Sequence, residues 1–533
     1  MLLYMSNEEI IAQQKARIEA LEKELKEAQL LAEDQKFQME YMRQEIELLK
    51  HRTYGRRSEQ LDKKYPTLFD DYDVFNEAED EAKEINEPIN IEDGEPQEVT
   101  FTVKGTKKKN LVNRLDKLKE VEIVHDLTDE EKVCKNCGST MVKIGEKVTY
   151  KIKYVPAKLV KEKHIFYTYK CEECYKNDVT NIVRAPYNLA FPKSMATSTL
   201  VANIITDKFV KSLPLYRQEK LFRNVGLDIS RANMSNWFLA GASMLKPLIN
   251  IMYKDILTHD IVHMDETPLT VIQGVTNKSY MWGLFSSKYD KQIKLYFYKD
   301  NRRHENAKEI LKGFKGYVVS DGYEAYDNVE TCTNVNCFAH ARRKYAEIIK
   351  AFKGNLTSSL CQEAIKYIDK LYRIEHLLEN KNASIEEIYQ TRQKDSKMVL
   401  DEYKLWLQKN YPNVPPQTAL GKAMAYSMNR MDNLSNYLLD GRLPIDNNLA
   451  ERGMKSFVIG RKNWLFCFAE NGAQMSSIAY SMVETAIANK LNVYEYLVYL
   501  FDTLPKINND DVDNLRKLLP YSPDLPEYLK VQK

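Results

Sequence analysis

The sequence predicts a multidomain α/β protein, and three observations support this fold class. The chain has 533 residues, which is more than one compact core usually holds. Its hydrophobic pattern changes several times, from a seven-residue repeat near the N-terminus, through short runs around paired cysteines, to helical and then strand-like segments. Charged residues make up 29% and apolar residues 44% of the chain, as in ordinary soluble proteins. We therefore expect several separately folded modules.

Residues 1–52 are predicted to form a coiled coil. Between residues 11 and 49 no Pro or Gly interrupts the chain, and the 3.5-residue spacing of mostly apolar side chains is typical of coiled coils. Gln14 and Gln35 lie in the seam and predict a modest association. A single amphipathic helix folded back on the protein is the alternative. The a and d positions are Ile11, Gln14, Ile18, Leu21, Leu25, Ala28, Ala32, Gln35, Met39, Met42, Ile46 and Leu49.

Residues 53–110 are predicted to be an acidic flexible linker that ends in a basic stretch. Between Asp70 and Glu98 thirteen residues are acidic and only Lys83 is basic. Such a composition buries too little apolar surface to offset the conformational entropy of the chain. Seven basic residues follow between Phe101 and Glu120. The net charge is only +2 because this acidic segment offsets an excess of basic residues in the rest of the chain. Those basic residues could bind a polyanion.

Residues 111–185 are predicted to form a zinc-binding module. Cys134 and Cys137 form one Cys-x-x-Cys pair, and Cys171 and Cys174 form a second pair after thirty-three intervening residues. Four thiolates at about 2.3 Å from one Zn²⁺ ion make a closed tetrahedral site, so the ion would be structural. Buried or redox-active cysteines are the alternative. The other four cysteines are isolated and are interpreted as core residues.

Residues 186–255 are predicted to form a helical, helix-turn-helix-like module that binds DNA. The segment LYRQEKLFRNV is followed by GLD and then by ISRANMSNWFLAG, with Gly226 at the turn and Ser230 as N-cap. The second helix would expose Arg231, Asn233 and Asn236, and such polar side chains at its N-terminal end suit the major groove. Plain helical packing is the alternative, because signals this short are common in helical proteins.

Residues 256–345 and 441–500 are predicted to form one α/β core, which a helical insertion over 346–440 interrupts and a C-terminal tail over 501–533 follows. Three strand-like runs (IVHMDETPLTVI, YMWGLFSS and IKLYFYKD) precede a helical run (ENAKEILKG) and two further strands (GYVVSDG and NVNCFAH). Three strands, a helix and further strands follow one another in a ribonuclease-H-like core, although sequence alone predicts class rather than topology.

Three carboxylates in this core are candidates for a metal-dependent catalytic site. Asp265 ends an apolar run, Asp321 follows another, and Glu451 lies in the helix start DNNLAER. Acids from a strand, a strand tip and a helix can converge on two Mg²⁺ ions, which prefer oxygen ligands and for which Mn²⁺ could substitute. Two ions about 3.5–4 Å apart activate the attacking oxygen and stabilise the leaving oxygen of an in-line displacement.

Composition alone does not single out these three acids, because the chain has seventy-six acidic residues. An Asp after a strand is more often a turn residue. Spacing alone would equally allow four other acids, namely Asp260, Glu266, Glu324 and Glu470.

Seven segments along nearly the whole chain carry a further signal. They are YGRRSEQL (54–61), VCKNCG with KCEEC, SLPLYRQEKLFRNVGLDISRANMSNW (212–237), HMDETPL (263–269), VVSDGYEAY (318–326), CFAHARRKY (337–345) and PIDNNLAERGMKSFVIGRKNWLF (444–466). Together, and in this order, they resemble the insertion sequence 66 family of bacterial transposases. Each segment alone is moderately specific, whereas seven in order are highly specific.

The resemblance implies an enzyme that cleaves phosphodiester bonds at the ends of an insertion sequence and joins the freed 3′-hydroxyls to target DNA. It implies that Asp265, Asp321 and Glu451 are the catalytic DDE acids and that the four paired cysteines bind zinc. Its partners would be double-stranded DNA, as transposon ends and as target, and small companion proteins of the same element. The stretch KGTKKKNLVNRL lacks the prolines usual in the family before the zinc module, which leaves its role in DNA binding open.

Basic side chains near the acids are predicted to hold DNA phosphates. They would fix the register of the DNA without reading its sequence, and Trp464 could stack on an unpaired base near the cut. A solvated helix face for the arginines and core packing for Trp464 are the alternatives. The predicted contacts are His340, Arg342, Arg343, Arg452, Lys455, Arg461, Lys462 and Trp464.

Two other functions compete with this interpretation: a non-catalytic DNA-binding protein and a general metal-dependent nuclease. Cleavage without joining would select the nuclease, and binding without metal-dependent cleavage would select the DNA-binding protein. A homo-oligomer, most simply a dimer, is expected because two DNA ends must come together. The sequence contains no run of eighteen apolar residues and no secretory signal, so we expect no membrane contact and a cytoplasmic location.

Overall fold

The structure, a computed structural model, describes residues 194–531 apart from 277, 352–355 and 509. It also describes 159–170, 182–184, 190–192, 17–29 and isolated positions before residue 51. The chain divides into two units, residues 1–71 with 164–533 and residues 72–163. Of the second unit only residues 159–163 are described. The acidic linker and the four paired cysteines therefore lie outside the described residues.

Part of the predicted coiled coil is described, and it is helical over residues 17–29. The seam side chains Ile18, Leu21 and Leu25 are 54%, 53% and 60% exposed. Pairing of this helix with a second chain stays a prediction.

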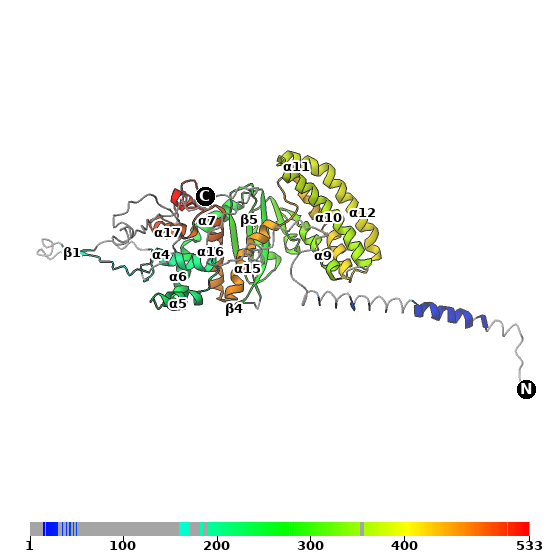
Figure 1. Cartoon of the computed structure of the whole chain (residues 1–533), viewed down its shortest axis with the longest axis horizontal. Helices are drawn as coiled ribbons and strands as arrows, with labels where there is room; N and C mark the ends of the chain where they lie inside the picture. Colours follow the sequence, from blue (N-terminus) through cyan, green and yellow to red (C-terminus); the bar gives the residue numbers. More distant parts are fainter. Residues whose placement is uncertain are drawn as a thin grey trace, which may run out of the picture. The chain divides into compact units, whose positions relative to one another are not determined.

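A five-stranded mixed sheet organises residues 261–336 (Figure 1). The strands lie in the order β6-β5-β3-β7-β8; β3, β5 and β6 are antiparallel, whereas β3, β7 and β8 are parallel. Helix α8 (His304–Ile310) lies between β6 and β7 in the sequence, so three strands, a helix and two strands follow one another as expected. The strands are β3 (Ile261–Leu269), β5 (Ser279–Ser286), β6 (Lys294–Lys299), β7 (Tyr317–Ser320) and β8 (Thr333–Asn336).

Both faces of this sheet are buried, which explains the nearly continuous apolar runs of β3 and β7. Because side chains alternate along a strand, Ile261 and Val319 join one hydrophobic cluster, whereas Val262, Met264 and Val318 join the other. Helices that are distant in the sequence supply the two clusters. The strands are therefore held by residues far outside residues 261–336.

One face of the sheet packs against α15 (Asn448–Trp464) and α16 (Glu470–Ala488), shown in orange beside the green strands (Figure 1). Helix α16 also covers the outer edge of β6. The Ser481 hydroxyl accepts a hydrogen bond from Tyr296 N, and the Thr485 hydroxyl accepts from Lys294 N and donates to Lys294 O. These bonds satisfy backbone groups that an open sheet edge would leave exposed.

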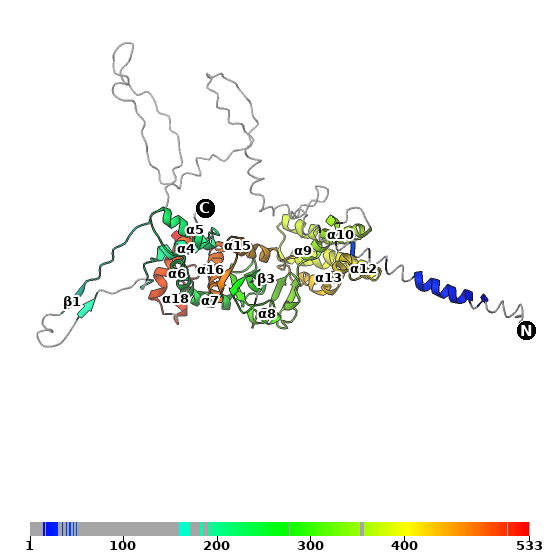
Figure 2. The same ribbon diagram turned by 90° about the horizontal axis from the view of Figure 1, so that it is seen from below.

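The helices that precede the sheet, α4 to α7, and the helices that follow α16 pack together in the same cluster. Residues 501–531, predicted as a tail, contribute buried leucines to it, and α18 contacts α7 (Figure 2). The Cα of Gly241 approaches Phe501, and a Cβ there would lie 3.2 Å from its ring. The helices are α4 (Ser198–Phe209), α5 (Leu215–Asn224), α6 (Arg231–Met244), α7 (Lys246–Ile256), α17 (Val493–Thr503) and α18 (Val512–Arg516).

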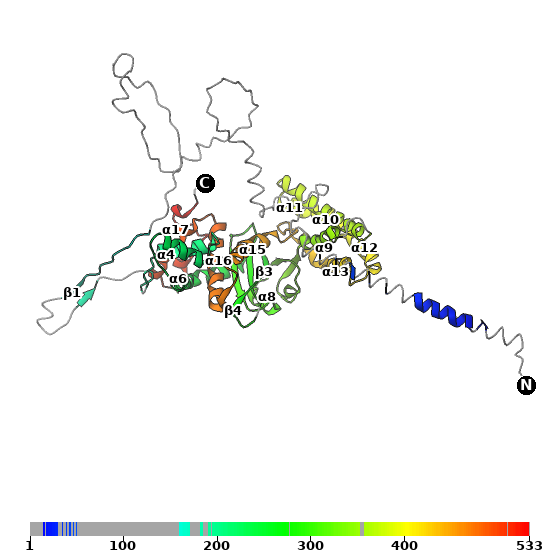
Figure 3. The ribbon, with the colours of Figure 1, turned by 60° about the horizontal axis from the view of Figure 1, so that its bottom comes forward.

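A group of helices from residue 338 to residue 435 packs against Ile261, Val319 and Val335, on the same face of the sheet as α15 (Figure 3). Its interior holds the hydroxyls of Tyr345, Tyr403 and Ser427, which hydrogen-bond to one another. Buried Arg392 pairs with Glu375 and donates to two backbone carbonyls. The helices are α9 (Phe338–Ala351), α10 (Leu356–Asn380), α11 (Ile385–Thr391), α12 (Lys397–Asn410), α13 (Ala419–Asn429) and α14 (Met431–Ser435).

Two small ladders complete the described strands. β1 (Thr168–Lys170) pairs antiparallel with β2 (Ile182–Arg184), and β4 (Val271–Gln273) pairs parallel with β9 (Cys467–Ala469). Among the described residues, no helix is long and apolar enough to cross a bilayer.

Candidate functional site

Asp265 and Asp321 lie at the same edge of the sheet because of the register between two parallel strands. In that register His263 of β3 is paired with Val319 of β7. Asp265 and Asp321 each follow these residues by two positions, so parallel strands carry both carboxylates to the same level. Backbone N–H groups of the following residues bind the two acids: Glu266 N donates to Asp265 Oδ1 over 2.9 Å, and Tyr323 N donates to Asp321 Oδ1 over 2.8 Å.

The turn after Asp321 depends on Gly322, which has a φ of +83°. An L side chain rarely adopts this backbone conformation, and a Cβ at this position would also lie 2.7 Å from the Tyr426 hydroxyl. That hydroxyl donates to the backbone carbonyl of Asp321 over 2.7 Å. A residue of the helical insertion thus helps to hold the second acid.

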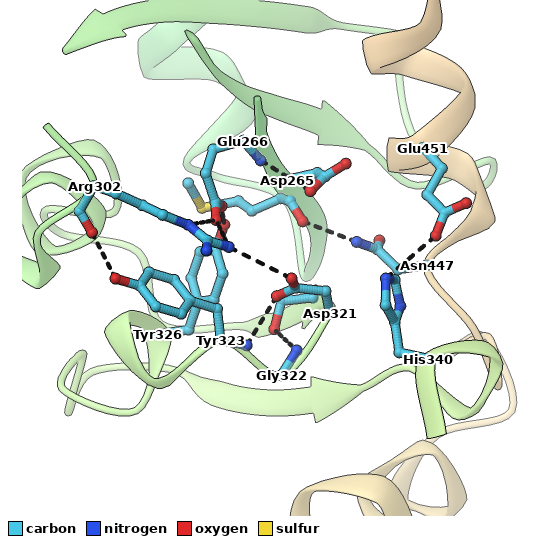
Figure 4. A network of polar contacts seen from close by, with 12 residues as sticks. Asp265, Glu266, Arg302, Asp321, Gly322, Tyr323, Tyr326, His340, Asn447 and Glu451 are labelled. Atoms are coloured by element: carbon cyan, nitrogen blue, oxygen red, sulfur yellow. Dashed lines mark hydrogen bonds and ion pairs between the residues drawn. The ribbon is translucent and has the colours of Figure 1, made fainter. Parts of the chain in front are cut away.

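Glu451 lies in the first turn of α15, which runs close against the sheet. The close approach requires Gly453, because a Cβ there would lie 2.8 Å from the ring of Phe285 on β5. The three predicted acids therefore come from β3, from the end of β7 and from α15, and they face one another (Figure 4).

Asn447 joins the start of α15 to the strand that carries Asp265. Its side chain is fully buried; Oδ1 lies 3.0 Å from Nδ1 of His263, and Nδ2 donates to Met264 O over 2.8 Å. Its backbone N–H donates to Cys337 Sγ over 3.1 Å. Because the Asn447 side chain bonds to β3, it does not cap α15. Asp446 Oδ1 instead accepts a hydrogen bond from the backbone N–H of Asn448, the first residue of the helix.

The acids of the site are close enough to raise one another's pKa values. Burial raises the pKa of Asp265 well above its usual value, and the charges of Glu266, Asp321 and Glu451 raise this pKa further. Burial and the charge of Asp321 also raise the pKa of Glu266. Crowded carboxylates of this kind are electrostatically unfavourable when all are ionised, unless a cation neutralises them.

The chemistry of these residues fits a hard divalent cation. Oxygen donors surround the site, and Oε1 of Glu451 is buried without a hydrogen-bond partner among the described residues. In their present positions, no three acidic, His or Cys side chains of the described residues converge closely enough to enclose an ion. The acids would therefore have to approach one another further to share one.

Two predicted DNA contacts lie directly beside Glu451. Nε2 of His340 and Nη2 of Arg343 each lie 3.5 Å from Glu451 Oε1. Burial lowers the pKa of His340, and the charge of Arg343 lowers it further, so His340 is mostly a neutral imidazole near pH 7. Arg343 is then the main positive charge beside the third acid.

The other predicted contacts around α9 and α15 differ in exposure. Arg342 is buried and pairs with Asp369 over 2.8 Å, and Trp464 packs against Phe457 with ring centroids 5.6 Å apart. Half-buried Arg461 donates to the Thr267 hydroxyl and to Pro268 O. These contacts lie within the chain, and DNA binding by the three residues stays a prediction. In contrast, Arg452 and Lys462 are exposed and Lys455 is half-buried.

The predicted helix-turn-helix residues lie where the sequence placed them. Ser230 caps α6 by accepting from Asn233 N, and Gly226 adopts a φ of +87° in the turn between α5 and α6. Arg231, Asn233 and Asn236 are exposed at the N-terminal half of α6. Arg231 Nε pairs with Glu219 of α5 over 3.1 Å, so it also braces the two helices.

Four residues at the site were not predicted as functional, although they determine its geometry: Glu266, Arg302, Tyr326 and Asn447. Of these, Glu266 was only one of several acids that spacing allowed. A second acid next to Asp265 within a buried strand is a usable signal, because a charge there needs a partner. Of the remaining spacing candidates, Asp260 pairs with Arg442, Glu470 accepts from Val275 N, and Glu324 is exposed.

Comparison with known proteins defines the class of protein to which this chain belongs. A family model described as "Transposase IS66 family" matches residues 193–475, and a second model, "zinc-finger binding domain of transposase IS66", matches residues 131–175. The protein is thus a transposase with a zinc-finger domain. Because the first match covers more than half of the chain, the chain belongs to the IS66 transposase family. The second match contains all four paired cysteines and supports a structural Zn²⁺ ion.

Three proteins of Sinorhizobium fredii (strain NBRC 101917 / NGR234) are similar to this chain. Uncharacterized protein y4jD is 27% identical over 504 residues, covering 90% of this chain and 94% of the relative. Uncharacterized protein y4qI is 27% identical over 504 residues (90% and 88%), and uncharacterized protein y4hP is 26% identical over 412 residues (73% and 73%). The similarity therefore runs over most of each chain.

Proposed function

We propose that this protein is a DDE DNA transposase that binds the ends of an insertion sequence, cleaves phosphodiester bonds there and joins the 3′-hydroxyl ends to target DNA. The convergence of Asp265, Asp321 and Glu451 in a chain of the IS66 family carries the proposal. The strand order supports a ribonuclease-H-like core over 256–345 and 441–500, with 346–440 as its helical insertion.

The chemistry has two balanced steps. A water oxygen attacks a phosphorus at the element end and loses a proton, while the bond from phosphorus to the 3′ oxygen breaks and that oxygen gains a proton. The new 3′-hydroxyl then attacks a target phosphorus in the same way and releases a target 3′-hydroxyl. Asp265, Asp321 and Glu451 would hold two Mg²⁺ ions, which supply Lewis-acid activation of the attacking and leaving oxygens when bound.

The surrounding residues would bind and orient the DNA. Arg343 beside Glu451, with exposed Arg452 and Lys462, offers positive charge for phosphates next to the cut. Helix α6 would enter a major groove through Asn233 and Asn236. Residues 111–185 would form the zinc module, and residues 1–52 would join two chains of a dimer, with companion proteins of the element as further partners.

Strand transfer with the element's own ends tests this proposal, with and without Mg²⁺. We expect Asp265→Asn, Asp321→Asn and Glu451→Gln each to lower cleavage and joining by far more than tenfold while DNA binding stays near wild type. The reason is that each change removes a charge that holds the ions, and tenfold in rate corresponds to about 1.4 kcal/mol. Glu324→Gln, an exposed acid three residues after Asp321, is the matched control.

The outcomes separate the competing functions. An acid whose variant keeps more than about a tenth of the activity is wrongly assigned. Cleavage without joining would identify a nuclease, and end binding without any metal-dependent cleavage would identify a non-catalytic DNA-binding protein.

A further inference from the structure

A fourth acid, Glu266, lies next to Asp265, and both oxygens of its carboxylate already have partners (Figure 4). Its side chain is 0% exposed. Oε1 accepts from Nε of Arg302 over 2.6 Å and also pairs with Nη2 of Arg302, while Oε2 accepts from the Tyr326 hydroxyl. Since both oxygens are occupied, Glu266 has a role different from that of the other three acids.

Arg302 is held on several sides between Glu266 and Asp321. Its guanidinium lies over the ring of Tyr323, 3.8 Å from the centroid, and the Tyr323 hydroxyl donates to Arg302 O over 2.8 Å. Its Nη2 is also 3.7 Å from Oδ2 of Asp321. That distance is within electrostatic reach but longer than a hydrogen bond.

This arrangement has a consequence for Asp321. An arginine that bonded directly to Asp321 would occupy the oxygen lone pairs that a divalent cation needs, because guanidinium and carboxylate match as a bidentate pair. An arginine far away would leave Asp321 without this nearby positive charge. The guanidinium of Arg302 lies between these two extremes, 3.7 Å from Asp321, and its bonds to Glu266 hold it there.

We propose that Glu266 is a positioning residue that restrains Arg302, so that Arg302 supports the charge of Asp321 without blocking its oxygens from a divalent cation. The inference rests on the proposed function, since it concerns the same metal-binding acids. It predicts that loss of the Glu266 charge frees Arg302 to bond to Asp321. Arg302 then competes with the cation.

Metal affinity measures this effect without any need for catalysis. Mn²⁺ binding to the full-length, zinc-loaded protein is titrated by the loss of the free Mn²⁺ electron paramagnetic resonance signal. We expect Glu266→Gln to raise the dissociation constant for Mn²⁺ about tenfold or more, because Arg302 then competes for Asp321. Glu305→Gln, an exposed acid three residues after Arg302, is the matched control and should bind Mn²⁺ as the wild type does.

The double variant Glu266→Gln/Arg302→Gln distinguishes restraint of Arg302 from a purely structural role. If Glu266 acts by restraining Arg302, removing both should recover most of the Mn²⁺ affinity lost in Glu266→Gln. The thermal midpoint of each metal-free variant is measured alongside, so that a loss of folding is recognised by itself.

Two results would overturn the inference while leaving the proposed function in place. One is a Glu266→Gln protein that binds Mn²⁺ as tightly as the wild type, and the other is a double variant that binds as weakly as Glu266→Gln. If the Asp321→Asn variant bound Mn²⁺ as tightly as the wild type, the metal site would be refuted, and with it both proposals.

Discussion

At the scale of single residues, the contact between Asn447 and His263 joins the start of α15, which carries Glu451, to β3, which carries Asp265. Asn447 contacts β3 through His263 and Met264 and contacts Cys337, which directly precedes α9. Because the Asn447 carbonyl oxygen only accepts, Nδ1 of His263 must carry the proton in this hydrogen bond. The hydrogen bond therefore requires either the neutral imidazole that is protonated on Nδ1 or the charged imidazolium. Burial disfavours the charged form.

Acid should destabilise the protein through His263. Burial lowers its pKa to about 4, whereas an unfolded chain has a value of about 6.5. Between these values the unfolded state binds a proton that the folded state does not, so stability is lost as pH falls from about 6.5 to about 4. The loss approaches about 3 kcal/mol. Thermal unfolding of metal-free protein across this range measures it.

His263→Gln should flatten this dependence, because Gln keeps an N–H donor but does not titrate. The exposed His304→Gln is the control and should keep the wild-type profile. The raised pKa of Asp265 acts with the opposite sign, since its neutral form favours the folded state and stability falls as pH rises. Comparing variant with wild type removes that contribution. An unchanged profile for His263→Gln would show that another group causes the acid sensitivity.

At the scale of elements, register and helix packing position the site. Parallel pairing of β3 with β7 brings Asp265 and Asp321 to one edge, and the approach permitted by Gly453 brings α15 to the same place. Helix α16 then covers the β6 edge, so this sheet does not offer an open edge there for pairing with another chain.

Helix α6 carries a prediction at this scale. Asn233→Ala and Asn236→Ala should each weaken specific binding to element ends by about 1–3 kcal/mol, because amide side chains can read base edges in the major groove. Ser243→Ala, an exposed position near the C-terminal end of the same helix, is the control. Fluorescence anisotropy with end DNA and with scrambled DNA measures the difference. Equal losses on both DNAs would point to phosphate contacts in place of base readout.

At the scale of the whole molecule, the modules differ in what stabilises them. The described core is held by two hydrophobic clusters that combine distant parts of the chain. The zinc-finger domain over 131–175 contains the four paired cysteines in its sequence, and many small modules of this kind fold only when their metal is bound.

Zinc removal should therefore act locally. Cys134→Ser or Cys171→Ser should lower the zinc content and expose residues 111–185 to protease, while the core from residue 194 onward keeps its thermal midpoint. Elemental analysis and limited proteolysis give the two readouts. A wild-type preparation that contains no zinc, purified without chelators, would contradict the zinc site.

Self-association should depend on the N-terminal heptads. Deleting residues 1–50 should lower the mass measured by light scattering and impair the pairing of two DNA ends, because the deletion removes the apolar seam, including Ile18, Leu21 and Leu25, through which two chains would pair. The measurement is made with and without end DNA, since DNA can itself bring two chains together. Full-length and truncated chains of equal mass under both conditions would reject the coiled coil.

Much of this architecture was predictable from local pattern. The paired cysteines, the cap at Ser230 and the strand runs around Asp265 and Asp321 each depend on only a few neighbouring residues. The family resemblance then selected three acids from seventy-six, a choice that spacing could not make. The exposure of a side chain such as Arg342, which pairs with Asp369, depends instead on partners that are distant in the sequence.

The sequence by itself determined which segments form helices and strands and which residues are available for metal chemistry, because periodicity and residue type are local properties. Tertiary structure decided which of these side chains meet. The bond from Asn447 to His263 joins residues 184 positions apart, and the pair of Glu266 with Arg302 spans 36. Contacts of this range leave no local pattern, since they arise only when strand register and helix packing bring separate elements to one edge of the sheet.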